Sequence, residues 1–284
     1  WFGLFMGGVS YYDAKRKIFH RNFLKEIEQE DVRSFYEDDQ HILWIGTSRG
    51  IYKVDLADKR IVGRYEFENN LVRCVIKDSQ ERIWIGSFGS GLGVGDGDLQ
   101  DLKFFKMDNS FPSNTINAIY EDSSKNIWVG TGEGLVCFSS LPDWDYKVYR
   151  REEGLNNAHI RAITEDGSGN IWVSTNKGIS CLLRDKGVFY NYDHWDNVPM
   201  GNFMSGSVAQ NQLGEVYFGS INGLCYFDPA FVLKKRESPA AIITEMKTFA
   251  PLGSVGSHEE VVAFDGQLKV RLNYMQNNFN ITFN

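Results

Sequence analysis

The sequence predicts an all-β fold, a β-propeller built from six copies of a four-stranded blade. Three observations predict it. A tryptophan-centred motif recurs about every 44 residues, each copy holds short runs with the alternation of β-strands, and no segment has a helical period. One such sheet cannot cover its own apolar faces, so the copies are expected to stack around an axis. The alternative, a β-sandwich, is disfavoured because sandwiches do not repeat their sequence.

The recurring motif is an aromatic residue followed two positions later by Gly or Ser. The aromatic residues are Trp1, Trp44, Trp84, Trp128, Trp172 and Tyr217. The ring and its flanking Ile or Val are suited to fill the layers between blades, and the small residue lets neighbouring backbone approach. The first copy lacks its opening strand. The repeats are expected near 1–23, 31–66, 71–106, 115–149, 159–192 and 203–228.

The fourth copy shows the order of elements within a blade. An alternating strand ends in Glu121-Asp122, a polar turn follows, and the aromatic strand comes next. Similar acidic residues recur at this place in other copies. We therefore expect the aspartate to bond its own turn backbone, because a catalytic carboxylate pair would be unique. The four strands of this copy are expected at 116–122, 127–131, 134–138 and 146–149.

The composition narrows the classes of function. The net charge is −7 and no run is rich in Lys or Arg, which argues against nucleic acid as a partner. No apolar run approaches the roughly 20 residues of a membrane span. The histidines and cysteines form no paired ligand motif, so neither a metal nor a cofactor is expected. The sequence thus predicts a binding or sensing module without catalytic residues.

The repeat resembles the two-component regulator propeller repeat. The resemblance rests on Glu121-Asp122, then Ile127–Thr131, then Gly134-Leu135, and the other copies are similar. The residues that follow resemble the start of the triple-tyrosine (Y_Y_Y) domain, an immunoglobulin-like β-sandwich, at 239–244 and 272–283. The resemblance implies propeller blades over 1–235, as part of a seven-bladed ring. Over 236–284 it implies a linker and the first strands of an incomplete sandwich.

The same resemblance implies a periplasmic location and a role in signal transduction. The chain would be the sensor region of a hybrid two-component system, and the histidine kinase and a membrane helix would lie elsewhere in the full-length protein. Many such regions bind an oligosaccharide to control polysaccharide-utilisation genes, and a homodimer through the sandwich is expected. The alternatives are a non-catalytic scaffold for subunit or protein contacts and, less favoured, a propeller polysaccharide lyase or hydrolase.

One recurrence suggests where a ligand binds. The second residue of the first strand is Arg33, Arg73 or Arg161 in three copies, and Asn117 fills this place in another. First strands line the central channel of a propeller, so these side chains are expected to surround its mouth. They are suited to bind an anionic group such as a uronate or a sulfate. In the alternative interpretation, which the recurrence of the position favours, each arginine tethers a loop of a neighbouring blade.

Several loop residues are further candidates for ligand binding. Trp195 lies outside the repeat register in a polar loop, which suits stacking on a sugar, although it could equally cover a gap beside a blade. The remaining candidates lie in loops expected near the same end of the channel. They are Phe88, His159, Asn176 and Lys177.

Overall fold

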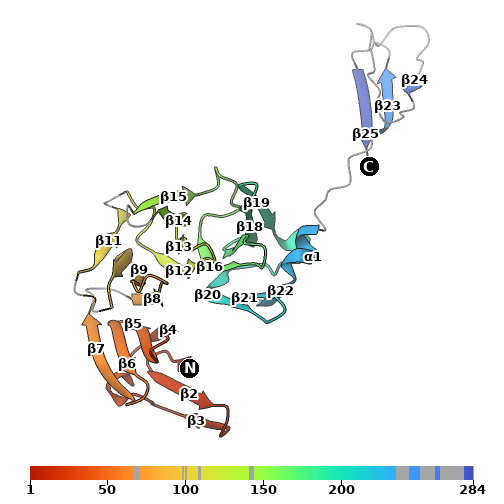
Figure 1. Ribbon diagram of the computed structural model, residues 1–284. Helices are drawn as coiled ribbons and strands as arrows, with labels where there is room; N and C mark the ends of the chain where they lie inside the picture. Colours follow the sequence, from red (N-terminus) through yellow and green to blue (C-terminus); the bar gives the residue numbers. More distant parts are fainter. Residues whose placement is uncertain are drawn as a thin grey trace. The chain divides into compact units, whose positions relative to one another are not determined.

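The computed structural model describes residues 1–66, 71–97, 99, 101–107, 110–140, 144–234, 243–249, 260–262 and 278–283. The chain divides into two compact units, Trp1–Pro229 and Ala230–Asn284. The first unit holds six antiparallel sheets that follow one another in chain order (Figure 1). The predicted all-β propeller with four-stranded blades is therefore confirmed. No helix within the described part is long and apolar enough to cross a membrane.

Four of the six blades have all four strands, paired in chain order. The second blade holds β4 (Val32–Glu37), β5 (Ile42–Thr47), β6 (Gly50–Asp55) and β7 (Arg60–Glu66). The third holds β8 (Leu71–Lys77), β9 (Ile83–Phe88), β10 (Leu92–Gly95) and β11 (Lys103–Phe105). The fourth holds β12 (Ile116–Glu121), β13 (Ile127–Thr131), β14 (Gly134–Ser140) and β15 (Asp145–Tyr149). The fifth holds β16 (Ile160–Glu165), β17 (Ile171–Thr175), β18 (Ile179–Leu183) and β19 (Val188–Tyr192).

The first and sixth blades have three strands each among the described residues. The first holds β1 (Phe2–Gly3), β2 (Val9–Asp13) and β3 (Ile18–His20). β1 corresponds to the second strand of a complete blade, and Trp1 immediately precedes it, as expected. The sixth holds β20 (Phe203–Gln210), β21 (Val216–Ser220) and β22 (Gly223–Phe227). A short helix, α1 (Pro229–Lys234), follows it. The repeat pattern does not predict this helix, although proline suits the first helical position.

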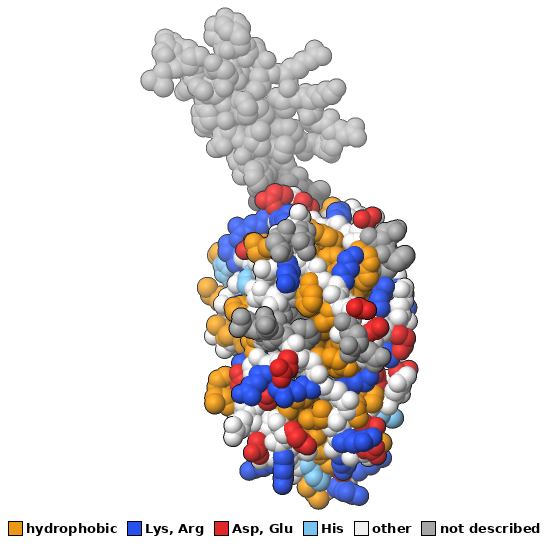
Figure 2. Space-filling model, turned by 90° about the vertical axis from the view of Figure 1, so that its left-hand side faces the viewer, with side chains coloured by type: hydrophobic (Ala, Val, Ile, Leu, Met, Phe, Trp, Pro, Cys, Tyr) orange, Lys and Arg blue, Asp and Glu red, His pale blue; other side chains and the backbone are white. Residues whose placement is uncertain are grey.

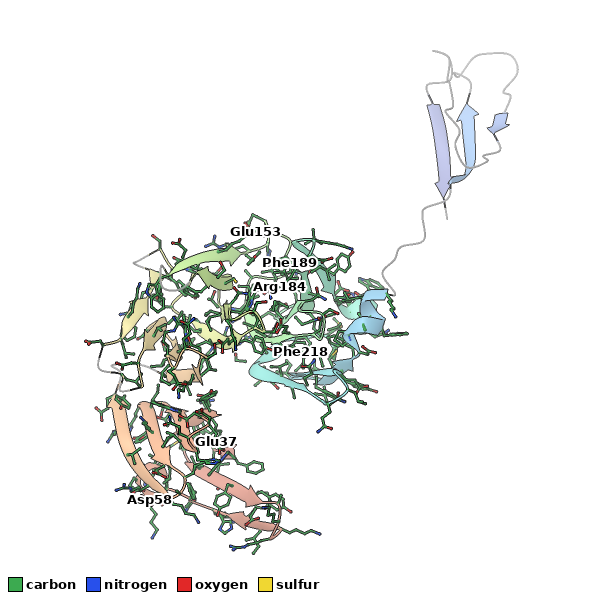
Figure 3. The ribbon with its side chains drawn as sticks, viewed as in Figure 1. Glu37, Asp58, Glu153, Arg184, Phe189 and Phe218 are labelled. Atoms are coloured by element: carbon green, nitrogen blue, oxygen red, sulfur yellow. The ribbon has the colours of Figure 1, made fainter. Side chains whose placement is uncertain are left out.

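The first strands of the blades lie side by side. β4 lies beside β8, β8 beside β12, β12 beside β16, and β16 beside β20. β20 also contacts β8 and β12, so the first strands of five blades surround one central space. Side chains fill the layers between consecutive sheets (Figure 3). A residue that projects inward from a first strand is therefore close to its equivalents in other blades.

Each motif tryptophan of the four complete blades is buried between its own blade and the next one. Trp44 clusters with Val72 and Ile85 of the third blade. Trp128 clusters in the same way with Ile160 and Ile163 of the fifth blade. The tryptophans of the four complete blades are at most 2% exposed. This packing is the one that the sequence motif predicts, because large aromatic rings contribute most to such layers.

The recurring aspartates bond their own turns, as predicted. In the fourth blade, Asp122 Oδ1 accepts from the backbone N–H groups of Ser124 (2.9 Å) and Asn126 (2.8 Å). Its Oδ2 accepts from the indole N–H of Trp128 at 2.8 Å, a bond that the sequence analysis did not foresee. Each of the other complete blades has the equivalent indole bond. One buried carboxylate thus joins the turn to the core.

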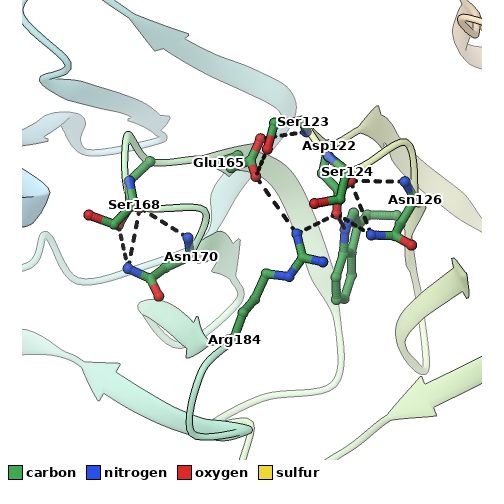
Figure 4. A network of polar contacts seen from close by, with 10 residues as sticks. Asp122, Ser123, Ser124, Asn126, Glu165, Ser168, Asn170 and Arg184 are labelled. Atoms are coloured by element: carbon green, nitrogen blue, oxygen red, sulfur yellow. Dashed lines mark hydrogen bonds and ion pairs between the residues drawn. The ribbon is translucent and has the colours of Figure 1, made fainter.

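The glutamates before the aspartates of the fourth and fifth blades each reach the preceding blade. Glu165 accepts from the backbone N–H and the hydroxyl of Ser123, both at 2.7 Å (Figure 4). Glu121 accepts from Ser79 in the same way. Arg184 donates to Asp122 at 2.9 Å and lies 3.8 Å from Glu165. The acidic residues are therefore used in holding neighbouring blades together.

The four cysteines are free thiols. Cys137 and Cys181 are buried in the third strands of adjacent blades. Burial raises the pKa of the Cys74 thiol and that of the Cys137 thiol to about 12. These side chains therefore stay protonated at neutral pH and pack as small apolar groups.

The second unit contains one antiparallel sheet among its described residues. Its strands are β23 (Ile243–Phe249), β24 (Glu260–Val262) and β25 (Asn278–Phe283), in the order β24-β23-β25. The segments 239–242 and 272–277, which carry much of the resemblance to the triple-tyrosine domain, lie outside the described residues. A sandwich in this unit remains a prediction.

Candidate functional site

A β-bulge in the first strand of each complete blade sets the position of one residue, which is the second of the strand or, in β8, the third. The ladder between the first and second strands skips this residue, at Arg33, Arg73, Asn117 and Arg161. The residue before it is buried in every case. The bulge releases the skipped residue from pairing and re-aims its side chain, as bulges beside functional sites do. We call these four the slot residues.

The three arginines of the slot line one cavity of about 390 Å³, here called the arginine cavity. Its volume lies within the roughly 300–1,000 Å³ that is usual for small-ligand sites. The described residues that line it include no Asp or Glu. By contrast, cationic and anionic side chains are interspersed on the outer face in Figure 2. The other lining residues are Leu71, Asn202, Phe203, Met204, Ser205 and Ile221.

Arg73 is half-buried and has neutral neighbours. Its Nη1 donates to Asn117 Oδ1, and its guanidinium lies 4.4 Å from the centre of the Phe88 ring. Burial lowers the pKa of Arg73, and the positive charges of Arg161 and Arg33 lower it further. The cavity thus concentrates positive charge. Phe88, a predicted site residue, supports the guanidinium through a cation–π contact.

Arg161 also has neutral partners. Its Nε donates to Asn176 Oδ1 at 2.7 Å, and its Nη1 donates to Ser205 Oγ of the sixth blade at 3.2 Å. Burial lowers the pKa of this guanidinium too. Arg33 differs, because it donates to Asp31 Oδ2 at 3.3 Å. Arg73 and Arg161 thus join neighbouring blades through uncharged acceptors, whereas the acceptor of Arg33 lies two residues before it in the chain.

Asn117 connects three blades from a position that is 1% exposed. Its Nδ2 donates to the Ile160 carbonyl at 2.8 Å and lies 3.3 Å from His159 Nε2. Its Oδ1 also accepts from Ser205 Oγ at 3.4 Å. Burial lowers the pKa of His159, and Arg161 and Arg73 lower it further. The imidazole therefore tends to stay neutral beside the arginines.

A second cavity of about 330 Å³ adjoins the first and is here called the histidine cavity. Asn176 lines it and accepts from Arg161, which lines the arginine cavity. Both signs of charge are present here, together with amide groups. The remaining lining residues are Gly132, Glu133, Arg150, Arg151, Glu152, Asn157, Ala158 and His159. Such a mixture of donors and acceptors suits the hydroxyl groups of a sugar.

Two predicted site residues lie apart from these cavities. Trp195 is 84% exposed in a short 3₁₀ turn, His194–Asp196, and its ring centre lies 4.6 Å from that of His194. Lys177 is exposed, and its backbone N–H donates to Thr175 Oγ1 in the turn after β17. Neither residue lines the arginine cavity or the histidine cavity.

The sequence analysis missed the contribution of the sixth blade. Met204 and Ser205 line the arginine cavity, in a longer bulge that also contains Gly206. A sequence signal for this bulge exists. In the complete blades, the buried residue just before the slot residue lies 12 positions before the motif tryptophan, as Ile160 lies before Trp172. In the sixth blade, the equivalent distance from Phe203 to Tyr217 is 14 positions. The two additional residues bring a hydroxyl to Arg161.

The described residues contain no cluster of three or more His, Cys, Asp or Glu side chains suited to a metal ion. The two cavities offer guanidinium, amide, imidazole and hydroxyl groups, and the histidine cavity adds the carboxylates of Glu133 and Glu152. These groups can bind a polar or anionic ligand by hydrogen bonds.

Comparisons with known proteins agree with this architecture. Residues 26–49, 66–89, 110–133 and 154–177 match the family described as two component regulator propeller. Each matched segment ends just after the aromatic strand of a complete blade. The predicted two-component regulator propeller repeats are thus confirmed. No curated protein matches the chain.

The chain is similar to the extracellular domain of BT3049 from B. thetaiotaomicron, which is assigned to a hybrid two-component system. The two share 44% identity with a TM-score of 0.82, over all of this chain and 39% of that one. PorZ of Porphyromonas gingivalis, a type-IX secretion component, is 15% identical with a TM-score of 0.56, over 83% of this chain and 40% of that one. Virginiamycin B lyase of Staphylococcus aureus is 16% identical with a TM-score of 0.55, over 69% of each chain. The last two likenesses show the fold alone.

Proposed function

We propose that this chain is part of the extracytoplasmic ligand-sensing region of a hybrid two-component sensor kinase, and that it binds an oligosaccharide. The observation that carries the proposal is the 44% identity to an extracellular domain of such a system. The arginine and histidine cavities support it, because they adjoin each other and offer many hydrogen-bonding groups. A periplasmic location follows from the same proposal.

The proposed signal passes to parts of the protein outside this chain. Ligand binding would favour one geometry of a homodimer formed through the sandwich, and a membrane helix would carry the change to the kinase. Control of polysaccharide-utilisation genes would be the output. These steps rest on the resemblance to sensor regions of this kind, including the resemblance of 239–244 and 272–283 to the triple-tyrosine domain.

We propose that this region is not an enzyme. In support, the acidic pairs that could suggest a glycosidase take part in structural bonds: Asp122 holds its own turn and Trp128, and Glu165 holds the preceding blade. The likeness to virginiamycin B lyase concerns the fold and carries no activity to this chain. A propeller lyase or hydrolase is therefore the less favoured function.

We further propose that the ring contains one more blade, the seventh. Two apolar sheet faces support it. Leu224 of the sixth blade is 60% exposed, whereas Leu135, its equivalent in the fourth blade, is buried against the fifth. Phe2 of the first blade is 46% exposed, whereas Ile45 at the equivalent position is fully buried. A blade between these faces would cover both, which is favourable because apolar burial drives such stacking.

Hydroxyl-radical footprinting tests the seventh blade. In the complete extracellular region, we expect Tyr226 and Phe2 to be oxidised several-fold more slowly than in the 1–284 chain, because the added blade would exclude solvent from both. Met107, which is 58% exposed in the connection between the third and fourth blades, serves as an internal reference because it lies on neither of the two open faces. Equal oxidation of Tyr226 and Phe2 in the two forms would show that no blade covers these faces.

Isothermal titration against an oligosaccharide panel tests the sensing proposal. We expect the complete extracellular region to bind at least one member with a Kd of about 1 mM or tighter, without releasing any product. Absence of binding to every member would favour the alternative, a scaffold that mediates protein contacts, and its exposed apolar faces would then serve a partner. Appearance of a cleaved product would instead establish an enzyme.

A further inference from the structure

We infer that the ligand carries a carboxylate or a sulfate ester, and that Arg73 and Arg161 bind this group in the arginine cavity. The inference rests on the proposed sensing function and names the chemical class of its ligand. Its basis is the concentration of three guanidinium groups in a cavity with no acid among the described residues that line it. The histidine cavity beside it supplies the mixed polar surface for the rest of the molecule.

The charge balance of the cavity is the first argument. Among the described residues, no carboxylate oxygen lies within ion-pair distance of Arg73 or Arg161. Other arginines of the same unit have such partners. These pairs are Arg64 with Glu66 (2.7 Å), Arg82 with Asp78 (2.7 Å) and Arg184 with Asp122 (2.9 Å). Arg73 and Arg161 are therefore two half-buried cations with no counter-ion among the described residues. They lie close enough for the charge of Arg161 to lower the pKa of Arg73, so they form a region of positive potential.

The unused donors are the second argument. A guanidinium has five N–H groups, and Arg161 uses its Nε and Nη1 on Asn176 and Ser205. Its Nη2 makes no hydrogen bond to a described residue. Arg73 uses Nη1 on Asn117. The planar fork of an arginine matches the oxygen pair of a carboxylate or a sulfate, and the resulting bonds are stronger than neutral ones.

A purely structural role explains these arginines less well. The bonds from Arg73 to Asn117 and from Arg161 to Ser205 do join neighbouring blades. Neutral glutamine could make the same bonds to amide and hydroxyl acceptors without bringing like charges together. An anionic ligand would provide a counter-ion for both guanidinium groups. The hydrogen bonds to neutral acceptors would orient these groups before the ligand binds, which reduces the entropic cost of binding.

The two adjoining cavities also indicate the form of the ligand. The anionic group would bind between Arg73 and Arg161, and a neighbouring sugar unit would lie against Asn176 and His159. The geometry therefore favours an acidic oligosaccharide over a free inorganic anion, because an isolated anion would leave the polar surface of the histidine cavity unused.

The test uses charged and neutral forms of the same sugars on the complete extracellular region. The probes are trigalacturonic acid with its methyl ester, a sulfated chondroitin disaccharide with its desulfated form, and inorganic sulfate. We expect at least one acidic probe to bind about 10-fold or more tightly than its neutral counterpart. Arg73→Gln and Arg161→Gln should each weaken that binding about 10-fold or more, and Arg73→Lys should weaken it less.

Arg60→Gln is the matched control, because Arg60 lies on β7, the fourth strand of its blade, and pairs with Asp58. It removes the same charge and should leave binding unchanged, and thermal unfolding of each variant confirms that it is folded. Equal binding of charged and neutral forms, or binding of neutral forms alone, overturns this inference while the sensing proposal stands. Preference for inorganic sulfate over both acidic sugars also overturns it, and failure of every sugar to bind contradicts both proposals.

Discussion

Asp122→Ala is expected to lower the free energy of unfolding of the propeller by about 3 kcal/mol, because several buried groups lose their partner together. The carboxylate is 2% exposed and accepts from the indole of Trp128 and from two turn N–H groups. It also receives Arg184 at 2.9 Å. Alanine would leave the indole N–H and the turn donors buried without acceptors, and Arg184 without its nearest counter-charge.

Urea unfolding followed by tryptophan fluorescence measures this loss, because all seven tryptophans lie in the first unit. Asp55→Ala is the matched control. Asp55 also caps a turn, by accepting from the backbone N–H groups of Ala57 (2.8 Å) and Asp58 (3.2 Å), but these bonds are exposed. Asp55→Ala should lower the free energy of unfolding by about 1 kcal/mol or less. Equal losses for the two variants would mean that the buried indole bond contributes nothing.

Gly86→Ser is expected to destabilise the third blade by about 2–3 kcal/mol through overpacking. A Cβ on Gly86 would clash with the Cys74 thiol and would lie 2.7 Å from the Cγ2 atom of Ile116 in the next blade. The fifth blade has Ser174 at the same position without such a thiol, because its first strand has Ala162 opposite. The first-strand residue and the facing residue of the next blade therefore both affect which side chain this position accepts.

A double-mutant cycle isolates this effect. Cys74→Ala combined with Gly86→Ser reproduces the Ala162–Ser174 pair of the fifth blade, so the double variant should be more stable than the sum of the two single changes predicts, by about 1 kcal/mol or more. Thermal unfolding of the four proteins measures the coupling. Strict additivity would show that Cys74 is not the obstacle, and that Ile116 alone limits the position.

The fold was predictable because the residues that pack the blades together recur at the same position in each repeat. Trp128 must be buried against the next blade and Asp122 must hold the turn before it, so both recur at fixed spacing. The ends of the unit were harder to predict. The sixth blade has Asn211 where the others have Asp, with Tyr217 as its aromatic, and α1 follows its third strand. The repeat pattern cannot predict elements that occur once.

The candidate site was predictable only where it follows the repeat. Arg73 and Arg161 stand out because they share one position in the strand, and the bulge that directs them inward recurs with it. Ser205 comes from a longer bulge in a single blade, so no repeated position marks it. Trp195 was proposed because its loop is polar and irregular, but the side chain is 84% exposed and lines neither cavity. Loop composition does not determine where a loop packs.

The most direct test of the central claim is titration of the tightest-binding acidic oligosaccharide into a region carrying both Arg73→Gln and Arg161→Gln. The account predicts that binding falls below detection while the unfolding temperature stays within a few degrees of the original. Undiminished affinity in this folded double variant would contradict it, because the ligand would then bind away from the first strands.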